Sequence, residues 1–186
     1  MWQAVLREAR LYELLTRIDA ELAAEAQAEG CSCGGPLHQA SYARKPRGGP
    51  PDLDRAFERR ASFCCAEREC RRRKTPASVR FLGRRVYLGV VVLLATALEG
   101  GLTRRRVATL RERVGVTERT LRRWQVWWRE AFAETSFWRV ARTRFLPPIE
   151  VGALPLSLVD RFVGADAVER AARVLRFLAP LSVRAL

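Results

Sequence analysis

Residues 102–130, LTRRRVATLRERVGVTERTLRRWQVWWRE, decide the fold that we predict for this chain. Its apolar residues recur at the spacing of two short helices that meet at an angle: Val107, Leu110, Val114, Val116, Leu121 and Trp124. Gly115 lies between the two sets, where a sharp turn needs a residue that tolerates positive φ. Thr117 suits the N-cap of the second helix, and Glu118 suits the positive end of its dipole. The sequence therefore predicts helices over 102–113 and 117–133, joined at Gly115.

The outward face of the second predicted helix is polar and rich in guanidinium groups. Arginine forks match the O6 and N7 acceptors of guanine, and they also match phosphates. In its glycine and its apolar spacing, the stretch resembles the helix-turn-helix of DNA-binding proteins, although Arg111 stands where those motifs carry a small residue. For a DNA-binding protein we expect Arg119, Thr120, Arg122 and Arg123 to face bases, and Arg104, Arg105 and Arg106 to hold phosphates. An ordinary αα-hairpin with a solvated basic face is the alternative.

The charge of the chain indicates a polyanionic partner. Its 186 residues include 34 Lys and Arg against 20 Asp and Glu, a net charge of +14, and the isoelectric point is near 11.1. Residues 1–29 carry three basic and six acidic side chains, and residues 146–186 carry five and four, so the positive excess lies between 30 and 145. Such an excess favours nucleic acid as the partner. A GC-rich genome would equally explain why nearly all of these cations are arginine.

No targeting or membrane segment is expected. Residues 1–29 alternate apolar and charged residues, unlike a signal peptide. The longest apolar run, 86–98, spans 13 residues and is too short to cross a bilayer. We therefore predict no membrane association and a cytoplasmic, reducing compartment, where a DNA-binding protein would be nucleoid-associated.

Changes in composition divide the chain into four predicted parts. Residues 1–29 have the periodicity of an amphipathic helix, whose apolar stripe either the rest of the chain or a partner helix must cover. Residues 30–82 contain all five cysteines and the single histidine, with strands expected near 59–65 and 79–81 and an exposed loop or linker expected over 43–51, which is rich in proline and glycine. Residues 83–145 would form a three-helix domain whose first helix, 84–99, is central, and whose aromatic residues belong to the core. Residues 146–186 add helices near 156–162 and 166–178.

The cysteine spacing predicts a structural zinc site. Two turns that each present two thiolates from one side can complete a tetrahedral Zn²⁺ site. We expect the ligands to be Cys31, Cys33, Cys65 and Cys70, with Cys64 and His38 as alternates. Adjacent residues of a strand face opposite sides, so only one of Cys64 and Cys65 should point at the metal. Four thiolates leave no open position for water, which argues against a catalytic zinc.

A basic run follows the last cysteine directly: Arg71, Arg72, Arg73 and Lys74. Held by a metal-bound turn, these residues would form a rigid patch beside the helix-turn-helix and contact phosphates. A solvated charge run is the alternative.

Three features together resemble the zinc-ribbon and helix-turn-helix portion of insertion-sequence transposases and their accessory proteins. They are the Cys33-Gly-Gly turn, the Cys65 and Cys70 pair with the arginines that follow it, and the downstream helices. The resemblance covers residues 30–130. It implies a small zinc-ribbon module of short strands followed by a three-helix helix-turn-helix domain. With the amphipathic helices that the periodicity predicts at both ends, we expect a mainly α fold.

The expected function is therefore duplex DNA binding without enzymatic activity, in transposition or regulation. A transposase or another protein is a further expected partner, bound through the terminal helices. A scaffold for a partner protein, with zinc as a structural staple, is the alternative, and RNA binding is a third possibility. The chain has one histidine, no Ser-His-Asp set and no Gly-rich phosphate loop, so an enzyme is the weakest hypothesis.

Overall fold

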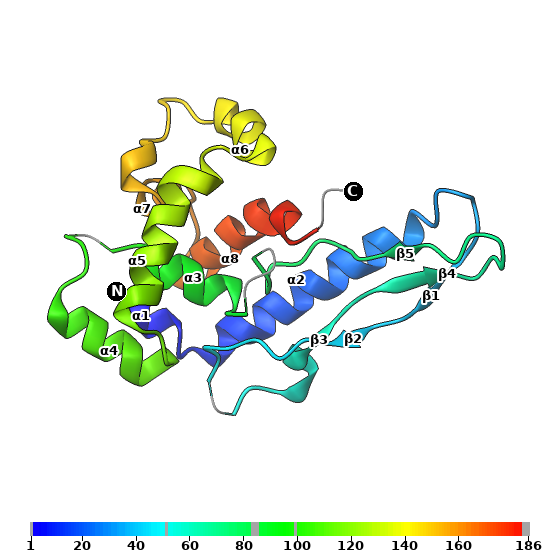
Figure 1. The fold of residues 1–186 in the computed structure, drawn as a ribbon, viewed down its shortest axis with the longest axis horizontal. Helices are drawn as coiled ribbons and strands as arrows, with labels where there is room; N and C mark the ends of the chain where they lie inside the picture. Colours follow the sequence, from blue (N-terminus) through cyan, green and yellow to red (C-terminus); the bar gives the residue numbers. More distant parts are fainter. Residues whose placement is uncertain (1, 51, 83–85, 99, 184–186) are drawn as a thin grey trace.

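The computed structural model describes residues 2–50, 52–82, 86–98 and 100–183 of the chain (Figure 1). The fold is mainly helical, with a small antiparallel sheet at one end of the long axis. Among the described residues, none of the helices combines the length and the apolar character that a bilayer span requires.

The predicted N-terminal helix is α2 (Ala9–Ala28), preceded by the short α1 (Trp2–Val5). With 20 residues, α2 is about 30 Å long, and it extends from the helical end of the molecule to the sheet (Figure 1). Leu11, Leu15 and Ile18 are buried in the main core. The rest of the chain thus covers the apolar stripe of this helix.

The C-terminal helix α8 (Ala167–Leu178) packs along α2 in the same direction. Arg10 near the start of α2 pairs with Asp166, the N-cap of α8. Further along, Arg176 NH1 of α8 lies 3.1 Å from Glu21 Oε2 of α2. These two ion pairs show that the helices run parallel, and the apolar faces of both helices close one core.

The apolar run forms α3 (Gly89–Thr96), in which every residue is buried. The predicted helix was longer, 84–99. The chain leaves the helix at Ala97, and the predicted ends at 84, 85 and 99 lie outside the described residues. Thr96 Oγ1 accepts a hydrogen bond of 2.9 Å from Trp128 Nε1, which satisfies a buried indole. The central position predicted for this helix is confirmed.

Two helices follow as the spacing predicts, α4 (Arg104–Val114) and α5 (Glu118–Trp127). Gly115 has a φ of 65° and ends α4. Thr117 Oγ1 accepts from the backbone N–H of Thr120 and caps α5. A π-helical turn, η2 (Trp128–Phe132), then extends α5 and buries Trp128 and Phe132.

The aromatic side chains after α5 belong mainly to the core, as predicted. Trp124, Trp128, Phe132 and Trp138 are buried, while Trp127 and Phe137 are half-buried against them. They lie on α5, η2 and α6 (Ser136–Ala141). The chain continues through η3 (Arg142–Arg144) and η4 (Val151–Ala153) to α7 (Leu156–Val159), which is shorter than the predicted 156–162, and ends in η5 (Ala179–Ser182) after α8.

The sheet has three antiparallel strands in the order β1 (Leu37–Gln39), β4 (Phe63–Cys65), β5 (Arg73–Lys74). Leu37 pairs with Cys65 and Phe63 with Lys74. A separate pair joins β2 (Tyr42–Ala43) to β3 (Arg59–Arg60), and the turn η1 (Arg55–Glu58) precedes β3.

The predicted strand at 79–81 is wrong. Phe81 makes only an isolated bridge, to Leu88, because the chain here follows α2 and bonds to it through Asp19 rather than to a neighbouring strand. A second, small hydrophobic cluster lies under the sheet, formed by Ala26, Leu37, Phe63 and Cys65. This cluster connects the end of α2 to the cysteines.

Candidate metal centre and basic surfaces

The first cysteine turn begins where α2 ends. Gly30 has a φ of 67°, a left-handed conformation that reverses the chain after the helix. Gly34 N then donates to Cys31 O at 2.8 Å, and Cys31 N donates to Gly35 O at 3.2 Å. The resulting tight turn presents the thiols of Cys31 and Cys33 on one side.

The second cysteine turn links β4 to β5. Cys65 N donates to Arg72 O at 2.9 Å, and Cys70 N donates to Glu67 O at 3.1 Å. Arg71 has a φ of 47°, so the turn closes through a left-handed residue that is not glycine. Ala66 N donates to Pro36 O at 2.9 Å and ties this turn to the first.

The two turns bring four thiols together. Cys31 Sγ lies 3.6 Å from Cys70 Sγ, Cys33 Sγ lies 3.5 Å from Cys65 Sγ, and all four sulfurs lie within 4.8 Å of one another. A tetrahedral Zn²⁺ with Zn–S bonds near 2.3 Å places its sulfurs roughly 3.8 Å apart. All five cysteines are free of disulfides. The predicted set of four ligands therefore has the shape that a metal ion requires.

Gly35 holds the two turns at this separation. A Cβ atom at this position would lie 2.9 Å from Cys65 Sγ, 3.4 Å from Cys33 Sγ and 2.5 Å from the side chain of Glu67. The backbone approaches the sulfurs closely only because the residue has no side chain. This close approach is a geometric reason for the Cys-Gly-Gly sequence.

The surroundings change the acidity of two thiols in opposite directions. The backbone N–H of Cys33 stabilises the Cys31 thiolate and lowers its pKa to about 6. Burial raises the pKa of Cys65 to about 12. The cluster thus combines a thiol that ionises readily with one that is protonated near neutral pH, and a cation would favour the thiolate of both.

The two alternate ligands lie outside the cluster. His38 and Cys64 are opposite each other in the β1–β4 register. His38 is exposed, and Cys64 Sγ contacts Arg71 O at 3.6 Å. The strand alternation at Cys64 and Cys65 is as predicted, with Cys65 alone of the two in the cluster.

Residues 30–82 are called here the cysteine module. A buried ion pair that we did not predict joins this module to α2. Asp19 Oδ2 accepts from Arg80 Nε at 2.6 Å, and Arg80 also donates to the carbonyls of Ala56 and Arg59. Arg60 is 1% exposed and donates to Pro76 O. Two arginines that contribute to the net positive charge, Arg60 and Arg80, are therefore buried and structural. Asp19 follows Leu15 by four residues, so it lies on the apolar face of α2, and this spacing was the available signal.

We had expected the basic run after Cys70 to lie beside the helix-turn-helix. In the structure it does not lie beside α4 and α5. Figure 1 shows β5 near one end of the long axis and α4 at the other. The two regions are separated because α2, about 30 Å long, lies between them. Lys74 Nζ is bound to Glu29 Oε2 at 2.8 Å and Gly30 O at 3.2 Å, and Arg72 NH1 donates to Ser32 Oγ at 3.0 Å. Arg71 and Arg73 are exposed.

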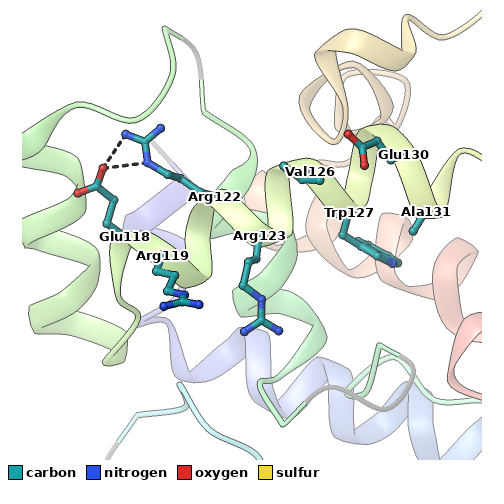
Figure 2. Close-up of a pocket in the computed structure, with 8 residues that line it drawn as sticks. All are labelled: Glu118, Arg119, Arg122, Arg123, Val126, Trp127, Glu130 and Ala131. Carbon is teal, nitrogen blue, oxygen red and sulfur yellow. Dashed lines mark hydrogen bonds and ion pairs between the residues drawn. The ribbon is translucent and has the colours of Figure 1, made fainter.

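The outward face of α5 carries the predicted base-contacting residues in two different states. Arg122 donates from Nε and NH2 to Glu118 Oε1, at 3.0 and 2.6 Å, and Thr120 Oγ1 lies 3.1 Å from Thr117 Oγ1. Arg119 and Arg123, one helical turn apart, make no hydrogen bond or ion pair with the described part of the chain. Figure 2 shows both pointing away from α5 on the same side.

An open hollow of about 790 Å³ follows this face, bounded by the arginines, Val126, Trp127, Glu130 and Ala131 (Figure 2). On α4, Arg104 and Arg105 are exposed at the start of the helix. Arg106 NH1 donates to Gly101 O at 2.8 Å. Arg106, one of the three arginines of α4 that we predicted to hold phosphates, therefore makes a hydrogen bond within the protein.

Comparison of the chain with protein-family models, with curated proteins and with solved structures finds no match.

Proposed function

We propose that this chain is a zinc-binding, non-enzymatic protein that grips duplex DNA with α5. In this proposal α4, the turn at Gly115 and α5 act as a helix-turn-helix, and Zn²⁺ holds Cys31, Cys33, Cys65 and Cys70 as a zinc ribbon. The protein acts in the cytoplasm on the nucleoid, as a regulator or as an accessory factor in transposition. The mobile-element role rests on the resemblance stated for residues 30–130.

One observation carries the DNA-binding proposal. Arg119 and Arg123 project from the same side of a capped helix that the main core holds in place, and they have no partner among the described residues. An unpaired guanidinium can form two parallel hydrogen bonds to guanine O6 and N7 or to a phosphate. Because Leu121 and Trp124 bury the opposite side of α5, the helix can present this face with little loss of entropy on binding.

Arg122 has a different role from its two neighbours. Its guanidinium is already bonded to Glu118, through an exposed pair that stabilises the first turn of α5. To contact DNA, Arg122 must first exchange a carboxylate for a base or phosphate. We therefore assign the main contacts to Arg119 and Arg123.

The four cysteines would hold zinc as a structural ion. The metal would supply the cross-link between the turn after α2 and the turn between β4 and β5, a region whose own hydrophobic cluster is small. Four thiolates complete a tetrahedron, so the donor set suits a closed structural site. Bound zinc would thus stabilise the end of the molecule that carries the sheet, and it would hold Arg71 and Arg73 at an exposed basic edge.

The test of the proposal compares variants on duplexes selected from a random DNA library by the zinc-loaded protein. Arg119→Ala/Arg123→Ala should lose affinity for the selected duplex and relax its base preference, at about 1 to 3 kcal/mol per bidentate contact. The matched control is Arg142→Ala/Arg144→Ala, which removes the same charge from η3, beyond α6. Equal losses of affinity in both variants would show that α5 contributes only non-specific positive charge. That result would refute base contacts by Arg119 and Arg123.

Exposed apolar side chains favour a second candidate, a scaffold for a partner protein. Leu146 is 87% exposed, Val163 is 77% exposed and Val140 is 68% exposed. Single exposed apolar residues are common, but three in the segment after α5 suit a protein contact. This candidate predicts a protein complex that survives nuclease treatment and is lost in Leu146→Asp/Val163→Asp.

A further inference from the structure

The loop of residues 44–50, called here the anchored loop, is a basic segment whose backbone is fixed to the helical core. Arg47 N donates to Val86 O at 2.7 Å, and Arg47 O accepts from Leu88 N at 3.0 Å. Both backbone groups of Arg47 are thus bonded to the segment that enters α3. We had predicted an exposed loop or linker over 43–51, and the structure shows a loop whose backbone is held at its centre.

Glycine allows the anchored loop to lie close against α3. Gly48 has a φ of 87°, and a Cβ atom at this position would lie 3.0 and 3.1 Å from the two methyl carbons of Val91. On the other side of Arg47, Pro46 fixes its own φ and favours an extended conformation at Lys45. The loop is therefore narrow and has few alternative conformations.

A single aromatic contact places the anchored loop beside the turn between α4 and α5. Tyr87, which forms the bridge with Arg47, packs edge-on against Trp124 of α5, with ring centroids 5.0 Å apart. The Tyr87 hydroxyl donates to Gly115 O at 3.4 Å. In Figure 2 the cyan segment of the chain lies on the side of α5 toward which Arg119 and Arg123 point.

The three cations of the anchored loop are used differently. Arg44 lies over the Phe81 ring, with its Cζ 4.5 Å from the ring centroid, and so packs against the protein. Lys45 and Arg47 are exposed, and neither side chain has a hydrogen bond or ion pair within residues 2–50, 52–82, 86–98 and 100–183. The loop thus holds two free charges on a fixed backbone next to α5.

We infer that Lys45 and Arg47 bind the DNA phosphates that border the groove entered by α5. This inference rests on the proposed function and adds a second element to the same DNA surface. Phosphate is the group that fits, because these cations lie on a rigid loop beside α5 and not on the helix that would enter the groove. Fixed phosphate contacts set the register of a helix in the groove without reading sequence.

The experiment measures the salt dependence of affinity for the selected duplex, using Lys45→Ala/Arg47→Ala. Each phosphate contact contributes a slope of about −0.9 in log K against log salt concentration. Loss of both contacts should make the slope less steep by about 2, with the base preference unchanged. The charge-conserving Lys45→Arg/Arg47→Lys should keep the wild-type slope. Arg142→Ala/Arg144→Ala, with the same loss of charge at η3, should also keep it.

Each other outcome overturns the inference in a recognisable way. An unchanged slope in Lys45→Ala/Arg47→Ala, with Arg119→Ala/Arg123→Ala still impaired, refutes the role of the anchored loop and leaves the proposed function standing. A changed base preference would show that the loop reads bases, against the phosphate assignment. Failure of the wild-type protein to bind any duplex refutes the proposed function and the inference together.

Discussion

Arg80 Nε lies 2.6 Å from Asp19 Oδ2, in an ion pair whose side chains are 8% and 5% exposed. Asp19 also accepts from Ser78 Oγ at 2.6 Å and from the backbone N–H of Val79 at 2.7 Å. A carboxylate in the middle of α2 thus binds the segment that leaves the cysteine module. The relative position of the metal site and the helical core depends on this pair.

The first prediction concerns this buried pair. Asp19→Ala leaves the Arg80 guanidinium buried without its carboxylate, and should lower the free energy of unfolding by about 3 to 5 kcal/mol. The matched control is Glu118→Ala, which breaks the exposed pair with Arg122 and should change stability by about 0.5 kcal/mol or less. Urea denaturation followed by circular dichroism measures both, and similar losses in the two variants would contradict a structural role for Asp19.

The metal site gives the second prediction. Cys65→Ser should abolish stoichiometric zinc binding, because Cys65 is the fully buried member of the cluster. The neighbouring Cys64→Ser is the control and should bind one zinc ion as the wild-type protein does, since its sulfur lies toward Arg71 O. Metal content after dialysis, with the spectrum of the cobalt-substituted protein, measures the difference. Loss of zinc in Cys64→Ser, with retention in Cys65→Ser, would exchange the two assignments.

Chelation of this metal should loosen one end of the molecule more than the other. In the proposed function zinc is the main cross-link of the sheet, so its removal should loosen the sheet, whereas α3, α5 and α8 retain their own core. Hydrogen exchange of the amides in β1 and β4 should therefore accelerate on chelation, and exchange in α3 should change little. Equal acceleration in both would mean that the metal supports the whole fold.

A substitution at Gly35 tests the close approach of its backbone to the cysteine sulfurs. The added methyl group of Gly35→Ala meets Cys65 Sγ and Glu67, so the two turns must move apart and zinc affinity should fall. At Gly152 a Cβ atom has space, with its nearest contact at 3.9 Å. Gly152→Ala should leave zinc affinity unchanged in a competition titration with a chelator of known affinity. Wild-type affinity in Gly35→Ala would show that the turns tolerate a wider separation.

Two threonines, one that caps α5 and one inside α2, should respond differently to loss of the hydroxyl. Thr117→Ala removes the side-chain acceptor at the start of α5 and should cost about 1 kcal/mol of stability. Thr16 lies inside α2, where its hydroxyl bonds back to Tyr12 O. Thr16→Ala should be neutral or slightly stabilising, because alanine has the higher helix propensity. A loss of stability in both variants would show that the hydroxyls matter for another reason.

Local patterns in the sequence were sufficient for some elements of this fold. The turn at Gly115 and the cap at Thr117 follow from single residues whose conformational and hydrogen-bonding preferences are strong, and the structure shows both. The four clustered cysteines follow from the need for paired thiols on opposed turns. The amphipathic periodicity similarly predicted α2 and α8.

Long-range partners decided the features that the sequence did not reveal. The burial of Arg80 depends on Asp19, 61 residues earlier in the chain. The position of β5 relative to α4 depends on the length and direction of α2, which places the two elements at different ends of the molecule. The anchored loop looked like a linker because its prolines and glycines carry no periodicity, although its backbone bonds to the segment before α3.

Selection of bound duplexes from a random DNA library decides whether α5 reads bases, with zinc-loaded protein at about 0.2 M salt, where binding through phosphates alone is weak. We expect enrichment of a short motif, with guanines at the positions whose selection Arg119→Ala/Arg123→Ala abolishes. Recovery of random sequences by the wild-type protein would contradict base recognition by α5.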